Sequence, residues 1–392
     1  MMSPLFALAF ATSVASAGQA QQPSWIRTVS IRTEVSYNDN AFLLPTGRLP
    51  RLDTGSWIDS VNGRFKDMDS AQDLVLRTNL ALGLEGPGLG GRTLALTADL
   101  AYEANLQNER RRHADLGVRI AQSLGSGGRL RFNLDARPSY YHKNYFSGAR
   151  QLDGNAATAP RERVYAAGIS HEVDVAAAYR RRLLRSAGVT LLAELELGYF
   201  HRVYDAPFKG RSRRGPGAGV DLTLELGRRW TLGLDVAYQA LAADVSNETI
   251  LFAERQFGVD YNGDLDLQDD FVRTVDNDGN PLSVDRSRTE REVAVSVGRE
   301  LGRWAMVEVA YGRRRRSFSS EQQYDFLHRD RIDTRNDISV GLDVRLTSGV
   351  HFLVDVRHAA QTTNRAGDPA ADGEDADYTQ NVVSAGLRYR LR

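Results

Sequence analysis

The chain has 392 residues, 42% of them hydrophobic and 26% charged. No stretch of about 18 apolar residues follows the N-terminal region, which excludes a helical membrane protein. The 50 Lys and Arg residues equal the 50 Asp and Glu residues, so no net positive field indicates nucleic acid as a partner. Cysteine is absent, which is compatible with an oxidising compartment. The order of residues must therefore decide the fold.

Residues 1–20 have the pattern of a signal peptide. An apolar run at 4–14 is followed by a mostly small-residue stretch at 15–20 and then by two glutamines. This pattern predicts export, with cleavage after Ala17 or Ala20, and a mature domain at 21–392. A buried helix is the alternative interpretation, because no Lys or Arg precedes the apolar run.

The mature chain is dominated by alternation of apolar and polar residues. In its first segment Val29, Ile31 and Val35 share one face, and Arg32 and Glu34 share the other. The lengths of such segments fit the ~9–11 residues of a tilted strand that crosses a bilayer. We expect about fourteen strands, near 27–37, 73–85, 93–105, 114–124, 129–141, 164–179, 188–201, 219–227, 230–240, 290–299, 304–313, 334–346, 350–358 and 379–391.

The connections alternate between short and long. The short ones are rich in glycine, as tight turns require, and the longest connection runs from about 241 to 289. A soluble β-sandwich does not order its loops in this way, whereas outer-membrane barrels have short periplasmic turns and long external loops. The sequence therefore predicts an all-β fold, an antiparallel transmembrane up-and-down β-barrel in the outer membrane of a Gram-negative bacterium.

Aromatic residues gather at the two ends of the predicted strands. Amphipathic rings favour the headgroup region of a bilayer, so this placement predicts two aromatic girdles in contact with outer-membrane lipid and lipopolysaccharide. Folding would require the barrel assembly machinery. The upper girdle comprises Tyr37, Tyr102, Tyr140, Tyr199, Tyr238 and Tyr311, and the lower girdle comprises Trp25, Trp230 and Trp304.

The polar faces of the strands predict a charged lumen. One side is mostly basic, with Arg32, Arg77, Arg119, Arg131, Arg137, Arg345, Arg357 and Arg388. The other side is acidic, with Glu172, Asp174, Glu194, Glu196, Asp221, Glu225, Asp235, Glu292 and Glu308. Facing walls of opposite charge suit the passage of small polar solutes, although the same charges could simply hold the barrel shut through salt bridges.

Two further chemistries receive little support from the sequence. The acidic segment 241–289 could enter the pore as a constriction or bind calcium, but Asp276–Asn280 fits an Asp-Gly turn better than an EF-hand. Ser170, His171, Glu172 and His201 could suggest a catalytic set, yet neighbours on a strand point to opposite faces. We therefore expect no metal, no cofactor and no enzyme activity.

Two short stretches carry a family resemblance. Val35–Phe42, VSYNDNAF, resembles the opening of proteobacterial β-barrel porins, including those encoded beside exopolysaccharide and exosortase loci. Tyr378–Arg390 resembles the closing strand of the same group and, more weakly, of the barrels of surface-lipoprotein assembly proteins. The resemblance implies a porin-like channel for passive diffusion of small hydrophilic solutes. The alternative is an accessory barrel for export or anchoring of surface polysaccharide.

Overall fold

The computed structural model describes residues 26–44, 68–125, 127–151, 162–227, 229–247, 250–253, 270–273, 283–321, 325, 328–364 and 377–391. The expected signal peptide, Trp25 and Asp276–Asn280 lie outside these residues. Within them, no helix is long and apolar enough to cross a membrane.

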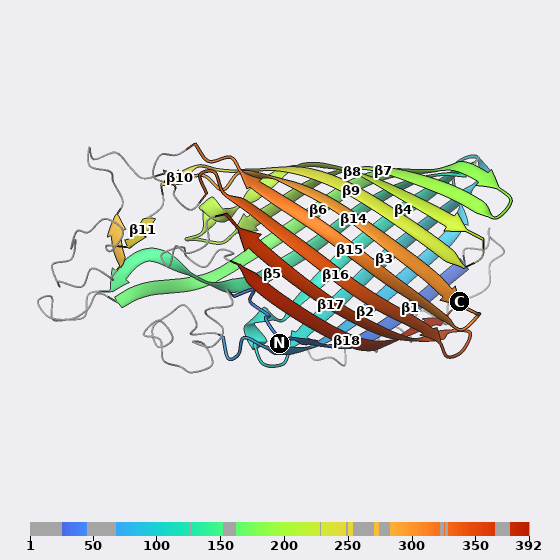
Figure 1. Cartoon of the computed structure of the whole chain (residues 1–392), viewed down its shortest axis with the longest axis horizontal. Coiled ribbons are helices and arrows are strands. Elements are labelled where there is room, and N and C mark those ends of the chain that lie inside the picture. The colour runs from blue at the N-terminus through green and yellow to red at the C-terminus, as the bar shows by residue number, and fades with distance from the viewer. Residues whose placement is uncertain are drawn as a thin grey trace, which may run out of the picture.

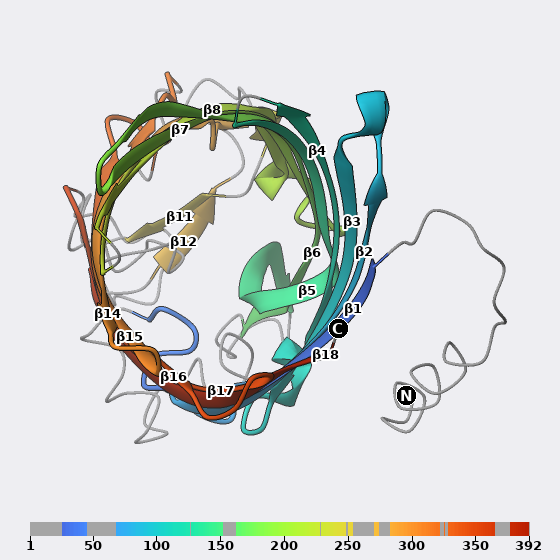
Figure 2. The ribbon, with the colours of Figure 1, turned by 90° about the vertical axis from the view of Figure 1, so that its right-hand side faces the viewer.

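The fold is a closed antiparallel barrel of fourteen strands in the described part of the chain, which confirms the predicted architecture (Figures 1 and 2). Each strand pairs with its neighbours in sequence, except that β9 pairs with β14 and β1 closes the barrel against β18. The barrel strands are β1 (Ile26–Asn38), β2 (Asp73–Pro87), β3 (Thr93–Asn105), β4 (His113–Gly125), β5 (Gly128–Gln151), β6 (Glu162–Ser186), β7 (Val189–Tyr204), β8 (Arg213–Leu226), β9 (Trp230–Ala243), β14 (Arg288–Leu301), β15 (Ala305–Phe318), β16 (Ile332–Arg345), β17 (Val350–Thr363) and β18 (Tyr378–Leu391).

The two ends of the barrel differ in their connections. At the short-turn end, tight hairpins join β6 to β7 and β14 to β15, and Gly188 and Gly302 take φ values of 77° and 76°, which β-branched and bulky residues avoid. At the long-loop end lie the connections from β5 to β6, from β9 to β14 and from β17 to β18. These are the two ends that the spacing of the sequence predicts.

Most strands are longer than predicted, and three of them differ from the predicted bounds by six residues or more at one end. β5 and β6 contain 24 and 25 residues, well beyond the predicted 129–141 and 164–179. Their extension reaches beyond the other barrel strands in Figure 1, and in Figure 2 part of β5 lies within the outline of the barrel opening. β8 begins at Arg213 rather than 219. The stretch around Pro216 has the composition of a loop, so the sequence did not predict it as strand, but it remains paired with β7.

The segment between β9 and β14 is not a featureless loop. It contains β10 (Ser246–Asn247) paired with β13 (Ser283–Val284), and β11 (Ile250–Ala253) paired with β12 (Asp270–Arg273). Figure 1 places β11 beyond the long-loop end of the barrel. Where the structure describes this segment, it therefore adds short antiparallel pairs beyond the end of the barrel, and Figure 2 draws β11 and β12 within the outline of the opening.

The two stretches that carry the family resemblance meet where the barrel closes. The Asn40 side chain is fully buried, and its Nδ2 donates hydrogen bonds of 2.9 Å to the carbonyls of Leu44 and Thr379. Asp39 accepts bonds of 2.6 Å from the backbone and side-chain amides of Asn381. The opening motif thus fastens the end of β1 to β18 and leaves Phe42 buried in a small apolar cluster.

Candidate pore lining

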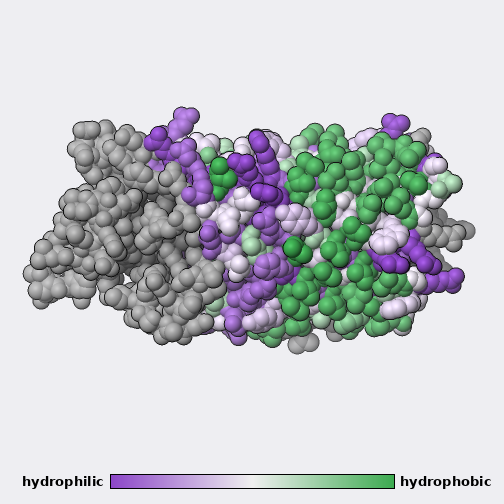
Figure 3. Space-filling view, in the orientation of Figure 1, coloured by the Kyte–Doolittle hydropathy of each residue, from purple (hydrophilic) through white to green (hydrophobic). Residues whose placement is uncertain are grey.

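The outer face of the barrel is apolar and the inner face is polar. Leu195 and Leu197 occupy outward positions of β7 and are 52% and 60% exposed in the isolated chain. On the face drawn in Figure 3, hydrophobic residues form a band around the barrel, bordered by hydrophilic residues toward the long-loop end. An exposed apolar band on a closed barrel is the surface that hydrocarbon covers.

Most of the expected girdle residues lie on this outer face. Tyr37, Tyr102, Tyr199, Tyr238 and Tyr311 are between 41% and 50% exposed, on the same parity as the outward leucines and valines of their strands. At the short-turn end, Trp230 begins β9 with 41% exposure, and Trp304 precedes β15 with 59%. Their contact with lipid headgroups stays a prediction.

Tyr140 was assigned to the upper girdle, and this prediction is wrong. Its ring lies 4.9 Å from that of His113 and 4.6 Å from that of His142, and the Arg137 guanidinium lies 5.0 Å from its centroid. The β5–β6 ladder shifts register between Arg137 and Tyr140, and Ser139 has a φ of 58°. This irregularity breaks the two-residue alternation, so Tyr140 faces the inner cluster instead of lipid.

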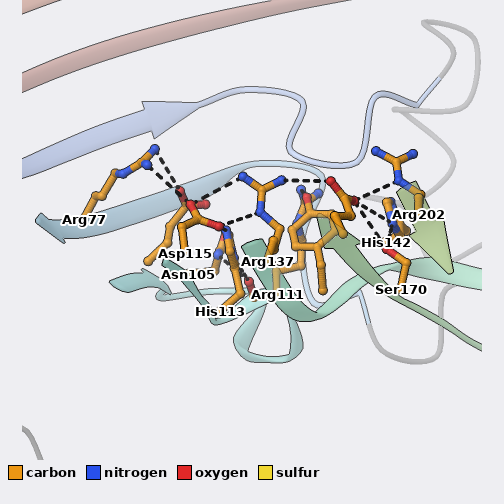
Figure 4. Close-up of polar contacts among 12 residues, drawn as sticks. Arg77, Asn105, Arg111, His113, Asp115, Arg137, His142, Ser170 and Arg202 are labelled. Carbon is orange, nitrogen blue, oxygen red and sulfur yellow. Dashed lines mark hydrogen bonds and ion pairs between the residues drawn. The ribbon is translucent and has the colours of Figure 1, made fainter. Parts of the chain in front are cut away.

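The predicted basic residues all occupy inward positions, but most of them are paired. Arg77 lies 3.4 Å from Asp115, which Arg137 also contacts at 2.6 Å (Figure 4). Sequence reasoning missed Asp115 as a partner on this side. Carboxylates contact Arg32, Arg77, Arg131, Arg137, Arg357 and Arg388, whereas Arg119 donates to Asn133 and Arg345 donates to the carbonyl of Thr347. The expected basic side is therefore largely neutralised.

The predicted acidic residues also face inward, and one arginine of the other side reaches them. Arg131 on β5 contacts Glu194 at 2.6 Å and Glu196 at 3.1 Å, both on β7. Inward side chains of a curved sheet converge, so residues two strands apart can meet. Glu172 and Glu292 also have arginine partners, whereas Asp174, Asp221, Glu225, Asp235 and Glu308 have no ion pair with any described residue.

Carboxylates that have no ion pair with a described residue gather along adjacent strands. Asp135 is directly opposite Asp174 in the β5–β6 ladder, and Asp221 is directly opposite Asp235 in the β8–β9 ladder. The charge of Glu196 acts on both Asp174 and Asp235. The sequence alone does not align Asp135 with Asp174, because it does not fix the register between the two strands.

Ser170, His142 and Glu172 come together on the inner wall without forming a catalytic triad. His142 Nε2 lies 2.8 Å from Ser170 Oγ, and the same nitrogen is 3.8 Å from the Glu172 carboxylate (Figure 4). A triad needs the carboxylate on the other ring nitrogen, where it orients the base. Ser170 is also fully buried, so a substrate could not reach its hydroxyl.

His171 was expected to point away from Ser170, and it does. Its Nε2 lies 3.2 Å from Asp205, while Ser170 contacts His142 on the inner wall. No group of three or more possible metal-binding side chains occurs among the residues with a described position. The inner wall is thus a lining of paired and unpaired charges.

Comparison with known proteins gives structural matches alone. No family model matches the chain, and neither does any curated protein. An anion-selective porin from Comamonas acidovorans has a TM-score of 0.39 and 11% identity, covering 94% of this chain and 100% of that one. The outer membrane protein OprD from Pseudomonas aeruginosa has a TM-score of 0.37 and 10% identity, covering 94% of each chain.

A third match is a bacterial polysaccharide outer membrane secretin, with a TM-score of 0.36, 9% identity, and coverage of 93% of this chain and 99% of that one. Matches this distant transfer no substrate. The assignment to a membrane therefore rests on the closed fourteen-strand barrel and its apolar outer band in the described part of the chain. The chain is a transmembrane β-barrel of the outer-membrane type.

Proposed function

We propose that the barrel is a passive channel for small hydrophilic solutes. The observation that carries the proposal is the exposure of charged side chains on the inner wall. The side chains of Arg32, Arg77 and Arg357 are 45%, 46% and 47% exposed although all three make ion pairs, and that of Glu196 is 43% exposed. A lumen packed with side chains would bury these groups, whereas a water-filled lumen leaves them solvated.

The charge distribution supports selectivity inside such a lumen. Unpaired carboxylates occupy the inner wall from β6 to β9, and arginines of β2, β5, β17 and β18 are held by carboxylates. A wall of one sign raises the local concentration of counter-ions and penalises apolar solutes. We expect the middle of the lumen to favour cations.

The test is conductance of the purified protein in a planar lipid bilayer, with the reversal potential measured across a salt gradient. Replacing Glu194, Glu196 and Glu225 together with Gln removes negative charge and frees Arg131, so selectivity should move toward anions. Replacing Arg119, Arg131 and Arg137 with Gln should move it toward cations. Both shifts should shrink at 1 M salt, where the Debye length is about 3 Å.

A matched control is Arg291→Gln, because Arg291 has the outward parity of Val293 and Val295 on β14 and should leave selectivity unchanged. A folded protein that never conducts, with residues 244–287 present or deleted, would refute the channel. In that case the alternative function, export or anchoring of surface polysaccharide, would be the better explanation.

A further inference from the structure

An arginine whose side chain has no hydrogen-bond or ion-pair partner among the described residues lies buried at the long-loop end of the inner wall. Arg213 is the first residue of β8 and only 9% exposed. Its ladder partner on β7 is another arginine, Arg202. The side chain of Arg213 makes no hydrogen bond or ion pair with any described residue, and its buried Nε has no acceptor.

The surroundings of Arg213 hold more positive than negative charge. The charges of Arg202 and Arg316 act on it, and Glu290 is the carboxylate whose charge reaches it. Both nearby carboxylates are already engaged: Glu172 contacts Arg202 at 2.9 Å and Arg137 at 3.9 Å, and Glu290 contacts Arg288 at 2.5 Å and Arg316 at 3.3 Å. We call Arg202, Arg213, Arg288 and Arg316 the arginine cluster; Glu172 and Glu290 contact three of these arginines but not Arg213.

Such an arrangement is costly in an isolated protein. A buried charge without a counter-charge is strongly destabilising, and like charges directly opposite each other in a ladder add to the cost. A bound anion removes both penalties. The guanidinium group is suited to this task, because its forked N–H donors match the geometry of carboxylate and phosphate oxygens.

The arginine cluster is accessible from the lumen. The side chains of Arg202 and Arg316 are 22% and 21% exposed, and they occupy inward positions beside the buried Arg213. A solute that enters from the long-loop end therefore meets these guanidinium groups before it reaches the carboxylates of the middle wall. The inward position also excludes lipid headgroups as the source of the anion.

We propose that Arg213, with Arg202 and Arg316, forms a binding site for an oxyanion group of a solute, such as a carboxylate, phosphate or sulfate. The inference rests on the proposed channel, since it names a class of solute that the lumen would bind. It also explains why an arginine is buried at position 213, for which a purely structural lining gives no reason.

The test is thermal unfolding of the folded full-length protein in detergent micelles, titrated with sodium phosphate, sodium sulfate or sodium acetate at constant ionic strength against sodium chloride. At least one of the three oxyanions should raise the Tm beyond the chloride reference, and the order of the three identifies the preferred group. Arg213→Met should raise the half-saturating concentration at least about tenfold. It should not lower the Tm in chloride, because no partner is lost.

The control is Arg357→Met, on the inner wall of β17, which should keep the oxyanion response although it loses its contact with Asp337. If none of the three oxyanions stabilises the unsubstituted protein, or if Arg213→Met responds equally, the site is refuted. The measurement requires no conduction, so its failure is distinguishable from failure of the channel. A protein that conducts but shows no oxyanion response would retain the proposed function and lose this inference.

Discussion

A single pair of adjacent substitutions on β2 tests the assignment of the two barrel faces. Leu80 points outward between Ile31 and Leu100 of the neighbouring strands, and Asn79 points into the lumen between Arg32 and Ala101. Both positions lie at nearly the same depth. Leu80→Arg and Asn79→Arg therefore introduce the same side chain into lipid and into water.

The depth of Leu80 sets the expected magnitude. Leu74 is the ladder partner of the girdle residue Tyr37 and therefore marks the level of the girdle on β2. With a strand rise of about 3.3 Å per residue and a tilt of about 40°, Leu80 lies roughly 15 Å deeper in the bilayer than Leu74. The apolar band of such barrels is about 25 Å tall, so Leu80 lies near its middle. Arg at this depth should cost about 2–4 kcal/mol of folding free energy.

The two controls should cost less for different reasons. Leu74→Arg places the charge at the level of the girdle, where the cost falls to about 0–1 kcal/mol. Asn79→Arg avoids lipid but places a charge opposite Arg32, which adds about 0.2–1 kcal/mol of repulsion. The assay is urea unfolding from phospholipid vesicles, followed by tryptophan fluorescence. Equal losses at Leu80 and Asn79 would mean that the inward and outward faces are misassigned.

Two further predictions concern the long-loop end. Epitope tags near Asn277 or Asp372 should bind antibody on intact cells and a tag at Gly127, in a short turn, should not; labelling at Gly127 alone would invert the orientation. Burial lowers the pKa of the loop residue His328 from 6.5, although its contact with Asp325 opposes the shift. The folded loop therefore favours neutral histidine, and its stability should be complete above about pH 6.5 and decrease as the pH falls below it. After correction for the intrinsic exchange rate, which itself falls with pH, the protection factors of residues 328–331 should decrease as the pH is lowered from 7.5 to 5.5, and an unchanged opening free energy would contradict this.

The strands and their faces could be predicted from the sequence because both depend on local periodicity. Alternation places Leu195 outward and Glu194 inward whatever the strand pairs with, and the glycine-rich turns fix the direction of each strand. The same reasoning failed at Tyr140, where a backbone irregularity changes the parity, and at β8, where Gly and Pro concealed a continuing ladder. Both failures arise where local composition and the backbone hydrogen-bond ladder disagree.

The partners of the inward charges depended on the tertiary structure. Alternation showed that Arg131 and Glu194 point into the lumen, but only the register and the curvature of the closed sheet decide which inward residues meet. Register brings Asp135 opposite Asp174 and Arg213 opposite Arg202, and curvature lets Arg131 reach Glu194 across an intervening strand. Sequence periodicity has no information about pairing between strands, so the carboxylates of the middle wall and the unpartnered Arg213 became visible only when the barrel was closed.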